Sequence, residues 1–311
     1  MIRDRLSPAA DRRTRARGLR TVLGSDRLFA YTCLLPGALL MVGIVGLPMI
    51  NVFIMSVSHT NPAGALTGFA GLANFRRLLA DPVFPQIMRQ TLVWTVSMVV
   101  IATPVSIGLA LVLDQRFPGR PLARALIFAP WAVSFVFVAV VWRYIFDPYY
   151  GHLNLLLSAI TGGDIHVPWL GRPDTAMDSV VWVGITLTIP FTTIVTLAGL
   201  QSISHEITEA GRIDGASGLQ VFRHITLPLL QPVLTIATLV NVIYIFNSFP
   251  IIWTMTEGGP ANYTDTFVTF LYKRTFRSED FGGGAALSVI GFVILMIFSL
   301  LYVRATAREV F

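Results

Sequence analysis

Six long stretches of this chain contain no Asp, Glu, Lys or Arg. They run over Leu28–Ser58, Gln90–Leu113, Ala125–Trp142, Ser179–Ser204, Ile225–Thr256 and Phe281–Val303. A membrane-spanning helix needs roughly 20 mainly apolar residues to cross a hydrocarbon layer about 30 Å thick. Only 13% of the residues are charged, against about a quarter in an average soluble domain. The chain is therefore predicted to be an all-α, multi-pass membrane protein with six transmembrane helices.

The first and fifth stretches are longer than a bilayer is thick, so they must tilt, bend at a proline or project beyond the lipid. Pro36, Pro48 and Pro250 are the candidate bend points. The fifth span itself is expected over about 228–254, after a polar loop at 205–227. The domain prediction is an arginine-rich tail at 1–27 followed by a transmembrane domain at 28–311.

The distribution of cations predicts the orientation. With six spans, both termini lie on the same side, and fifteen Lys and Arg residues fall in the termini and the loops on that side, against eight in the other loops. By the positive-inside rule the termini face the cytoplasm. The net charge of +6 is read as a signal of topology and not of nucleic-acid binding.

Several chemistries are missing from the sequence. Lys273 is the only lysine and has no phosphate-loop glycines before it, and "HEITE" at 205–209 lacks the second histidine of a zinc-protease motif. "GASG" at 215–218 has no clear base for its serine, so no catalytic, metal or cofactor residue is assigned. The spans contain no acid or arginine for ion coupling, which favours energy from another protein. A solitary secondary transporter of small polar solutes stays as the alternative, because backbone carbonyls also bind sodium.

One polar segment lies between the fourth and fifth spans and reads "EAGRIDGASGLQVFRHITLP" at 209–228. We expect a short helix over 204–213, a turn at Gly215, and a second amphipathic helix capped by the Asp214 carboxylate. In the second helix, the apolar positions Leu219, Phe222 and Ile225 recur on one face up to Pro228. Two short helices meeting at a bend are suited to a partner's groove.

This segment resembles the cytoplasmic "EAA" loop of the permease subunits of type I ATP-binding-cassette importers. The similarity to their carbohydrate branch, the maltose and glycerol-phosphate type permeases, extends through segments such as "GLANFRRLLADPVF", "VPWLGRPD" and "TEGGPANYTDT". The resemblance implies a bacterial or archaeal cytoplasmic membrane, a second permease subunit forming a heterodimer, two ATP-binding subunits and an extracytoplasmic solute-binding protein. ATP and magnesium would be bound by the partner ATPase subunits and a sugar or polyol would be the substrate.

The same resemblance assigns the polar loop at 205–227, with its two short helices meeting at a bend, to coupling with the ATPase; this loop is called the hairpin below. The implied coupling residues are Glu209, Ala210, Asp214, Gly215, Ala216, Leu219, Phe222, Ile225 and Pro228. Glu209 would be a charged anchor for the partner, and the alternative is an ion pair with Arg212 on its own helix. Gly211 replaces the usual second alanine and is expected to loosen the first helix by about 1 kcal/mol.

A substrate pathway is predicted on the fifth span. Asn241, Tyr244, Asn247 and Ser248 fall within about 120° of helical arc, and their amides, hydroxyls and ring suit a sugar. Helix-to-helix hydrogen bonding is the equally weighted alternative.

Other aromatic and charged residues in and beside the third span have open roles. Trp131 and Trp142 are candidates for ring stacking, although an interfacial belt explains Trp142 as well. Arg143, Asp147 and the "EGGPANYTD" loop at 257–265 are expected on the outer side, where anchoring, docking of the binding protein or a simple turn stay open.

Overall fold

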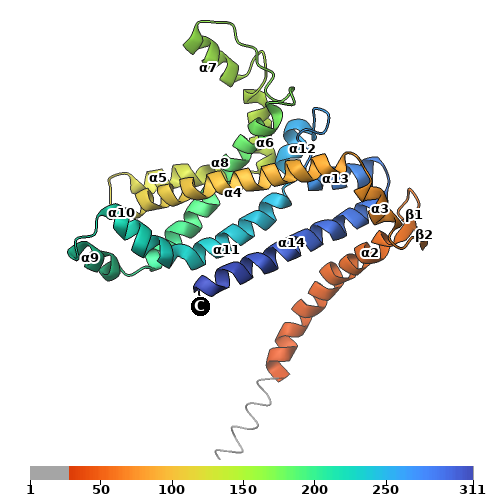
Figure 1. Cartoon of the computed structure of the whole chain (residues 1–311), viewed down its shortest axis with the longest axis horizontal. Coiled ribbons are helices and arrows are strands. Elements are labelled where there is room, and N and C mark those ends of the chain that lie inside the picture. The colour runs from red at the N-terminus through yellow and green to blue at the C-terminus, as the bar shows by residue number, and fades with distance from the viewer. Residues whose placement is uncertain (1–27, 311) are drawn as a thin grey trace, which may run out of the picture. The chain divides into compact units, whose positions relative to one another are not determined.

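The computed structural model describes residues 28–310, with side chains through 306 (Figure 1). The arginine-rich tail predicted at 1–27 lies outside the described residues. The chain divides into two compact units, residues 1–55 and 56–311.

The described part of the first unit is one apolar helical stretch. This stretch extends over Leu28–Ser56, one residue beyond the unit's boundary, and its most apolar part has no buried side chain. A helix that is apolar on every side and unburied by its own chain is suited to lipid. A π-helical turn, η1 (Val42–Gly46), lies immediately before α2 (Leu47–Ser56), and the Leu47 amide donates to the Val42 carbonyl. Pro48 has no amide to donate and its ring crowds the preceding turn, so a wider turn at this point relieves the helix.

The second unit is helical apart from one small two-stranded β-sheet. Its elements are β1 (Ser58–Thr60), β2 (Leu66–Phe69), α3 (Ala73–Leu79), α4 (Phe84–Asp114), α5 (Arg120–Phe128), η2 (Ala129–Ala132), α6 (Phe135–Ile145), α7 (His152–Thr161), α8 (Ala176–Ser202), α9 (His205–Ile213), α10 (Gly218–Val221), η3 (Phe222–Thr226), α11 (Leu227–Phe246), α12 (Pro250–Thr256), α13 (Phe267–Tyr272), η4 (Lys273–Arg277) and α14 (Phe281–Val310). The two strands are antiparallel, with Ser58 opposite Phe69, and an irregularity in the register follows His59.

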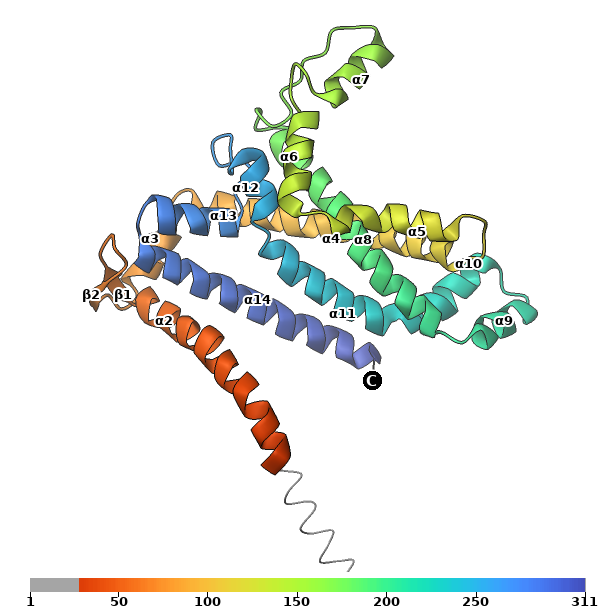
Figure 2. The same ribbon diagram turned by 180° about the vertical axis from the view of Figure 1, so that it is seen from behind.

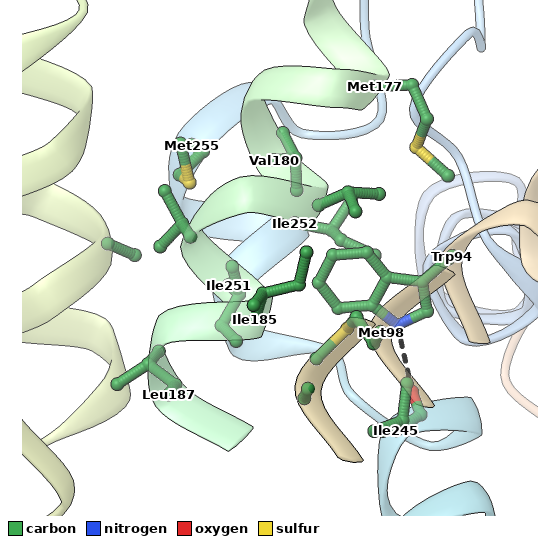
Figure 3. Packing of buried hydrophobic residues seen from close by; sticks show 14 of the residues in the cluster. Trp94, Met98, Met177, Val180, Ile185, Leu187, Ile245, Ile251, Ile252 and Met255 are labelled. Atoms are coloured by element: carbon green, nitrogen blue, oxygen red, sulfur yellow. Dashed lines mark hydrogen bonds between the residues drawn. The ribbon is translucent and has the colours of Figure 1, made fainter. Parts of the chain in front are cut away.

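The second unit is built around the pair α4 and α8, which pack along much of their length, and α11 lies against both. In Figure 2, α11 and α14 run beside one another below this pair. The main apolar core is formed by α4, α6, α8, α12 and the end of α11 (Figure 3). At its centre, the fully buried Trp94 of α4 donates its indole N–H to the Ile245 carbonyl of α11 over 3.0 Å. This hydrogen bond satisfies a polar group that would be costly to leave unpaired in an apolar core.

The predicted spans correspond to the long helices of the structure. Five helices of the described part are long and apolar enough to cross a membrane, or six if one bent pair forms a single span. The all-α prediction is confirmed, with the short strand pair as the only sheet among residues 28–310.

The third predicted span is not a straight helix. In place of one rod over 125–142, helices covering Arg120–Ala132 and Phe135–Ile145 meet at 95°. The break has a local cause, because Pro130 lies in the 3-10 turn η2, and Val133 and Ser134 then adopt extended backbone. Proline removes a helical donor and crowds the previous turn, so the sequence "APWAVS" ends one helix and begins another.

Two prolines, Pro228 and Pro250, were expected to shape the fifth predicted span. Helix α11 ends at Phe246 and α12 begins at Pro250, so the bend expected at Pro250 is present. The expectation that Pro228 opens the span is only partly met. Pro228 is the second residue of α11, but the helix continues backward without a break through the π-helical turn η3 into α10.

Candidate functional sites: a polar hairpin and a membrane cavity

The first hairpin helix forms as predicted. Helix α9 begins after Ser204, whose side chain accepts a hydrogen bond from the Glu206 amide over 3.3 Å. It ends before Asp214, and Gly215 follows with a φ of +86° and open space around the position of a side chain. Because L-residues with a side chain are strained at this φ, glycine is required here by backbone conformation and not by lack of room.

The second hairpin helix begins later than predicted, and Asp214 does not cap it. Helix α10 starts at Gly218 and has Ser217 as its N-cap: the Gln220 amide donates to the Ser217 hydroxyl, and the Ser217 amide donates to Gln220 Oε1 over 2.7 Å. This reciprocal pair is a capping box. Asp214 instead ends α9, where its amide donates to the Ala210 carbonyl. The pattern Ser-x-x-Gln was present in the sequence and predicts this cap better than the aspartate does.

Gly211 has a packing role that the sequence did not suggest. A Cβ built on Gly211 would lie 2.5 Å from Cδ1 of Ile225. The glycine therefore lets α9 approach the helical turn that follows α10, so the two arms of the hairpin contact each other. This contact offsets the lower intrinsic helix propensity of glycine at this position.

The hairpin exposes apolar side chains at its tip. Leu219 is 74% exposed and Ile213 is 85% exposed, although both are large aliphatic residues in a polar segment. Of the other predicted coupling residues, Glu209, Ala210, Asp214, Gly215 and Pro228 are exposed, and Ala216, Phe222 and Ile225 are partly buried. The sequence reading did not name Ile213 as a contact residue, although it belongs to the apolar face of the first helix. Large exposed aliphatic side chains in one short polar segment are typical of a surface that a partner covers.

Within the described residues, Glu209 forms no ion pair, so the alternative pairing with Arg212 is absent from this structure. The carboxylate projects into solvent from α9. It is thus available to a cationic side chain of another protein.

A cavity of about 210 Å³ lies where α4, α8, α11 and α12 meet the bend before α6. Its lining residues are Met98, Trp131, Phe135, Gly184, Leu187, Thr188, Phe191, Val240, Asn241, Tyr244, Ile245, Ser248 and Ile251. Most of this surface is apolar and aromatic, with a few polar groups, which is the usual composition of a small-molecule site.

The structure brings three of the four predicted pathway residues to this cavity. Asn241, Tyr244 and Ser248 line it, whereas Asn247 does not and donates its side-chain amide to the Ile243 carbonyl over 2.8 Å. Asn241 also donates to the Thr192 hydroxyl of α8 over 2.9 Å. Asn241 therefore makes a helix-to-helix hydrogen bond and also lines the cavity, and its role in a substrate pathway stays a prediction.

Aromatic rings surround the cavity in pairs. Trp131, predicted as a stacking candidate, lies 6.2 Å from Phe191 between ring centroids, and Phe135 lies 6.1 Å from Tyr244 in an edge-on arrangement. Trp142 packs on Phe146 and is not part of the cavity wall. Phe135 and Phe191 were missed by the sequence reading, because each follows a proline or helix break whose direction depends on tertiary structure.

Arg143 and Asp147 have structural partners. Arg143 donates to the Thr254 carbonyl near the end of α12 over 3.2 Å. Asp147 Oδ1 accepts from the amides of Tyr149 and Tyr150, and these hydrogen bonds hold the pKa of this carboxyl below its usual range. Arg143 therefore joins α6 to α12, Asp147 organises the chain after α6, and a docking role of either residue stays a prediction.

The "EGGPANYTD" loop is closed by two ion pairs. Glu257 pairs with Arg277 at 2.7 Å on the exposed side, and the fully buried Asp265 pairs with Lys273 at 2.6 Å. Burial raises the pKa of Asp265, and the Lys273 ammonium acts in the opposite direction. The loop is thus a compact, fixed structure and more than a simple turn.

The long apolar helices, the broken third span and the polar hairpin define a multi-pass membrane protein. Residues 102–309 match the family model described as the binding-protein-dependent transport system inner membrane component. Over 284 residues, the chain is 42% identical to an ABC transporter permease protein of Brucella suis biovar 1 (strain 1330), covering 91% of this chain and 98% of the relative.

Two further relatives are informative. The trehalose/maltose transport system permease protein MalF of Thermococcus litoralis is 34% identical over 274 residues, covering 88% of this chain and 92% of the relative. The crystal structure of a bacterial ABC transporter involved in the import of the acidic polysaccharide alginate contains a chain with the same fold, at a TM-score of 0.82 and 23% identity, covering 93% of this chain and 98% of that one. The chain therefore belongs to the family of inner membrane components of binding-protein-dependent transport systems, and it is an ABC transporter permease subunit and not an enzyme.

Proposed function

We propose that this subunit carries a sugar or related polyol across the cytoplasmic membrane of a bacterium or archaeon, with both termini in the cytoplasm. It works in a complex with a second permease subunit, two ATP-binding subunits and an extracytoplasmic solute-binding protein. ATP and magnesium bind to the ATP-binding subunits. The sugar class is supported by the trehalose/maltose permease among the relatives and by an uncharged, aromatic-rich cavity in the membrane domain.

One observation carries the proposal most directly: a self-supporting hairpin exposes Ile213 and Leu219 beside the unpaired Glu209. The Ser217 capping box and the close approach of Gly211 to Ile225 hold the hairpin together from within. A rigid amphipathic tip of this kind fits a groove on another protein. We assign that groove to the ATP-binding subunit, whose closure would move α11 through the continuous helix that begins at Gly218.

The cavity supplies the route for the solute. Sugar rings have apolar faces that stack on aromatic side chains and hydroxyl groups that need hydrogen-bond partners, and Trp131, Tyr244, Asn241 and Ser248 provide both. The alternating-access motion of the helices would open this cavity to one side of the membrane at a time.

The test is purification of the tagged chain from its host in mild detergent, with mass spectrometry of the proteins that accompany it and an assay of ATP hydrolysis. The expected result is recovery of an ATP-binding subunit and a second permease. A Gly215→Pro variant should lose the ATP-binding subunit and uptake, because proline cannot adopt the φ of +86° at this position. Glu209→Lys should also lose uptake while insertion into the membrane persists.

Gly218→Pro is the matched control. Gly218 is the first residue of α10 and is also exposed with open space around it, but proline is favoured at this helical position. The preceding Ser217 already has the extended backbone that proline requires of its neighbour. This variant should keep its partners and its uptake. A chain that purifies alone, and that transports in liposomes without ATP, would contradict the proposed function.

A further inference from the structure

The cavity has a residue behind its wall that fixes one of its polar groups. Thr192 is 1% exposed and does not line the cavity. Its hydroxyl group lies 3.1 Å from the Thr188 carbonyl one helical turn earlier and 2.9 Å from Asn241 Nδ2 on α11. A hydroxyl has a single proton, so when it donates that proton to the Thr188 carbonyl it can only accept from Asn241.

This arrangement determines which end of the Asn241 amide faces the cavity. The amide nitrogen is held by Thr192 on α8, and the two polar atoms of a carboxamide point in different directions. Asn241 is itself part of the cavity wall. Its oxygen is consequently the group left to meet a solute, and this oxygen can only accept a hydrogen bond.

A second wall residue has the same polarity. The Thr188 hydroxyl donates to the Gly184 carbonyl over 2.9 Å, so its proton is committed and only acceptor capacity remains for the cavity. Tyr244 and Ser248 add hydroxyl groups that donate or accept. All the residues that line the cavity are uncharged.

We propose that Thr192 is a positioning residue that turns the Asn241 oxygen toward the cavity, and that the cavity thereby selects neutral, hydroxyl-rich solutes over anionic ones. This inference rests on the proposed sugar-import function. Sugar hydroxyls donate to the fixed acceptors at Asn241 and Thr188. A phosphate or carboxylate oxygen only accepts, so at Asn241 and Thr188 it would meet two acceptors, and no cation lines the cavity to offset its loss of water.

The test compares Thr192→Val with Thr192→Ser in the complete purified complex. Valine has nearly the shape of threonine but lacks the acceptor, whereas serine retains it. In a cryo-EM structure of the valine variant the Asn241 side chain should leave its position beside residue 192, seen as a rotation or displacement of the amide group, and in the serine variant it should not. An unchanged amide in the valine variant would overturn the positioning role, whatever solute the complex imports.

The transport measurement uses radiolabelled trehalose and maltose as neutral probes and glycerol 3-phosphate and glucose 6-phosphate as anionic probes. Neutral probes should be imported and should not be displaced by excess anion. In Thr192→Val the half-saturation concentration should rise about fivefold to tenfold with little change in maximal rate, the size expected for one misdirected neutral hydrogen bond, and Thr192→Ser should restore it. Preferential import of an anionic probe would overturn the selectivity while leaving the importer function intact. Failure of the chain to copurify with an ATP-binding subunit is a different result, and it concerns only the proposed function.

Discussion

Gly184→Ala is expected to destabilise the contact between α4 and α8. A Cβ built on Gly184 would lie 2.7 Å from Sδ of Met98, 2.7 Å from Cη2 of Trp94 and 2.8 Å from Cε of Met98. Ordinary carbon contacts are about 3.5–4.0 Å, so these neighbours would have to move by close to 1 Å. Trp94 is fully buried and its indole is tied to the Ile245 carbonyl, which leaves it little freedom to move.

The magnitude is obtained from two opposing effects. Overpacking of a well-packed core costs about 1–3 kcal/mol. Replacement of glycine by alanine inside a helix returns up to about 1 kcal/mol. Met98 is flexible and absorbs part of the strain, so we expect a net loss of about 1–2 kcal/mol in the free energy of unfolding. For a unit of this size, such a loss lowers the melting temperature by roughly 2–8 °C.

Thermal unfolding of the purified complex, followed by tryptophan fluorescence, measures this change. Gly108→Ala is the matched control, because Gly108 lies inside α4, the other helix of this pair, but a Cβ there would have no neighbour within 4 Å. The control should melt at or slightly above the temperature of the unmodified complex. If Gly184→Ala melts with the control, the reasoning that α4 and α8 approach each other through this glycine is refuted.

Three further predictions concern the hairpin, the outer loop and the segment after α6. Ser217→Ala should weaken the hairpin by about 1 kcal/mol and speed hydrogen exchange of its amides more than Asp214→Ala does, because Ser217 is the N-cap; the opposite order would restore the aspartate as the cap. Lys273→Met should cost about 3–5 kcal/mol at neutral pH, because it leaves the buried Asp265 carboxylate without its partner. The raised pKa of Asp265 means that the folded state binds a proton at this carboxyl more tightly than the unfolded state does. As the pH is lowered from 8 to 5, the difference in melting temperature between the variant and the unmodified protein should therefore become smaller. A larger difference at pH 5 would contradict the role of Lys273 as the partner of a buried Asp265 carboxylate. Asn154→Ala should make the segment after α6 sensitive to limited proteolysis, because the buried Asn154 amide joins three backbone carbonyls and the Trp169 indole of this segment; unchanged resistance would show that other contacts hold it.

The Asp147 and Asn154 contacts show why the segment between α6 and α8 was difficult to interpret from sequence. Polar residues beside a membrane span suggest binding, and Asp147 was considered for docking on that basis. In the structure, Asp147 and Asn154 use their side chains to hold the chain's own backbone amides and carbonyls. Hydrogen bonds between residues several positions apart in a loop are not visible in any periodic pattern.

The candidate sites were predictable to different degrees. The hairpin was found because caps, glycine turns and amphipathic stripes are local features, and Gly215 adopts the conformation that its sequence context requires. Asp214 was wrongly predicted as the N-cap in place of Ser217, because both residue types are favoured at N-caps and the two residues lie only three positions apart. The polar positions on α11 were visible from their helical spacing, but their neighbour Thr192 was not, since it comes from another helix.

The sequence by itself determined that this chain is a multi-pass helical membrane protein with a polar hairpin between its fourth and fifth spans. The physical reason is that each span must make its own backbone hydrogen bonds within lipid, so transmembrane helices are visible in the sequence as continuous apolar stretches. Tertiary structure alone decided that Gly211 contacts Ile225 and that Thr192 reaches Asn241 at the edge of a cavity. These features depend on which faces of distant helices meet, and in a uniformly apolar span the sequence contains little to distinguish one face from another.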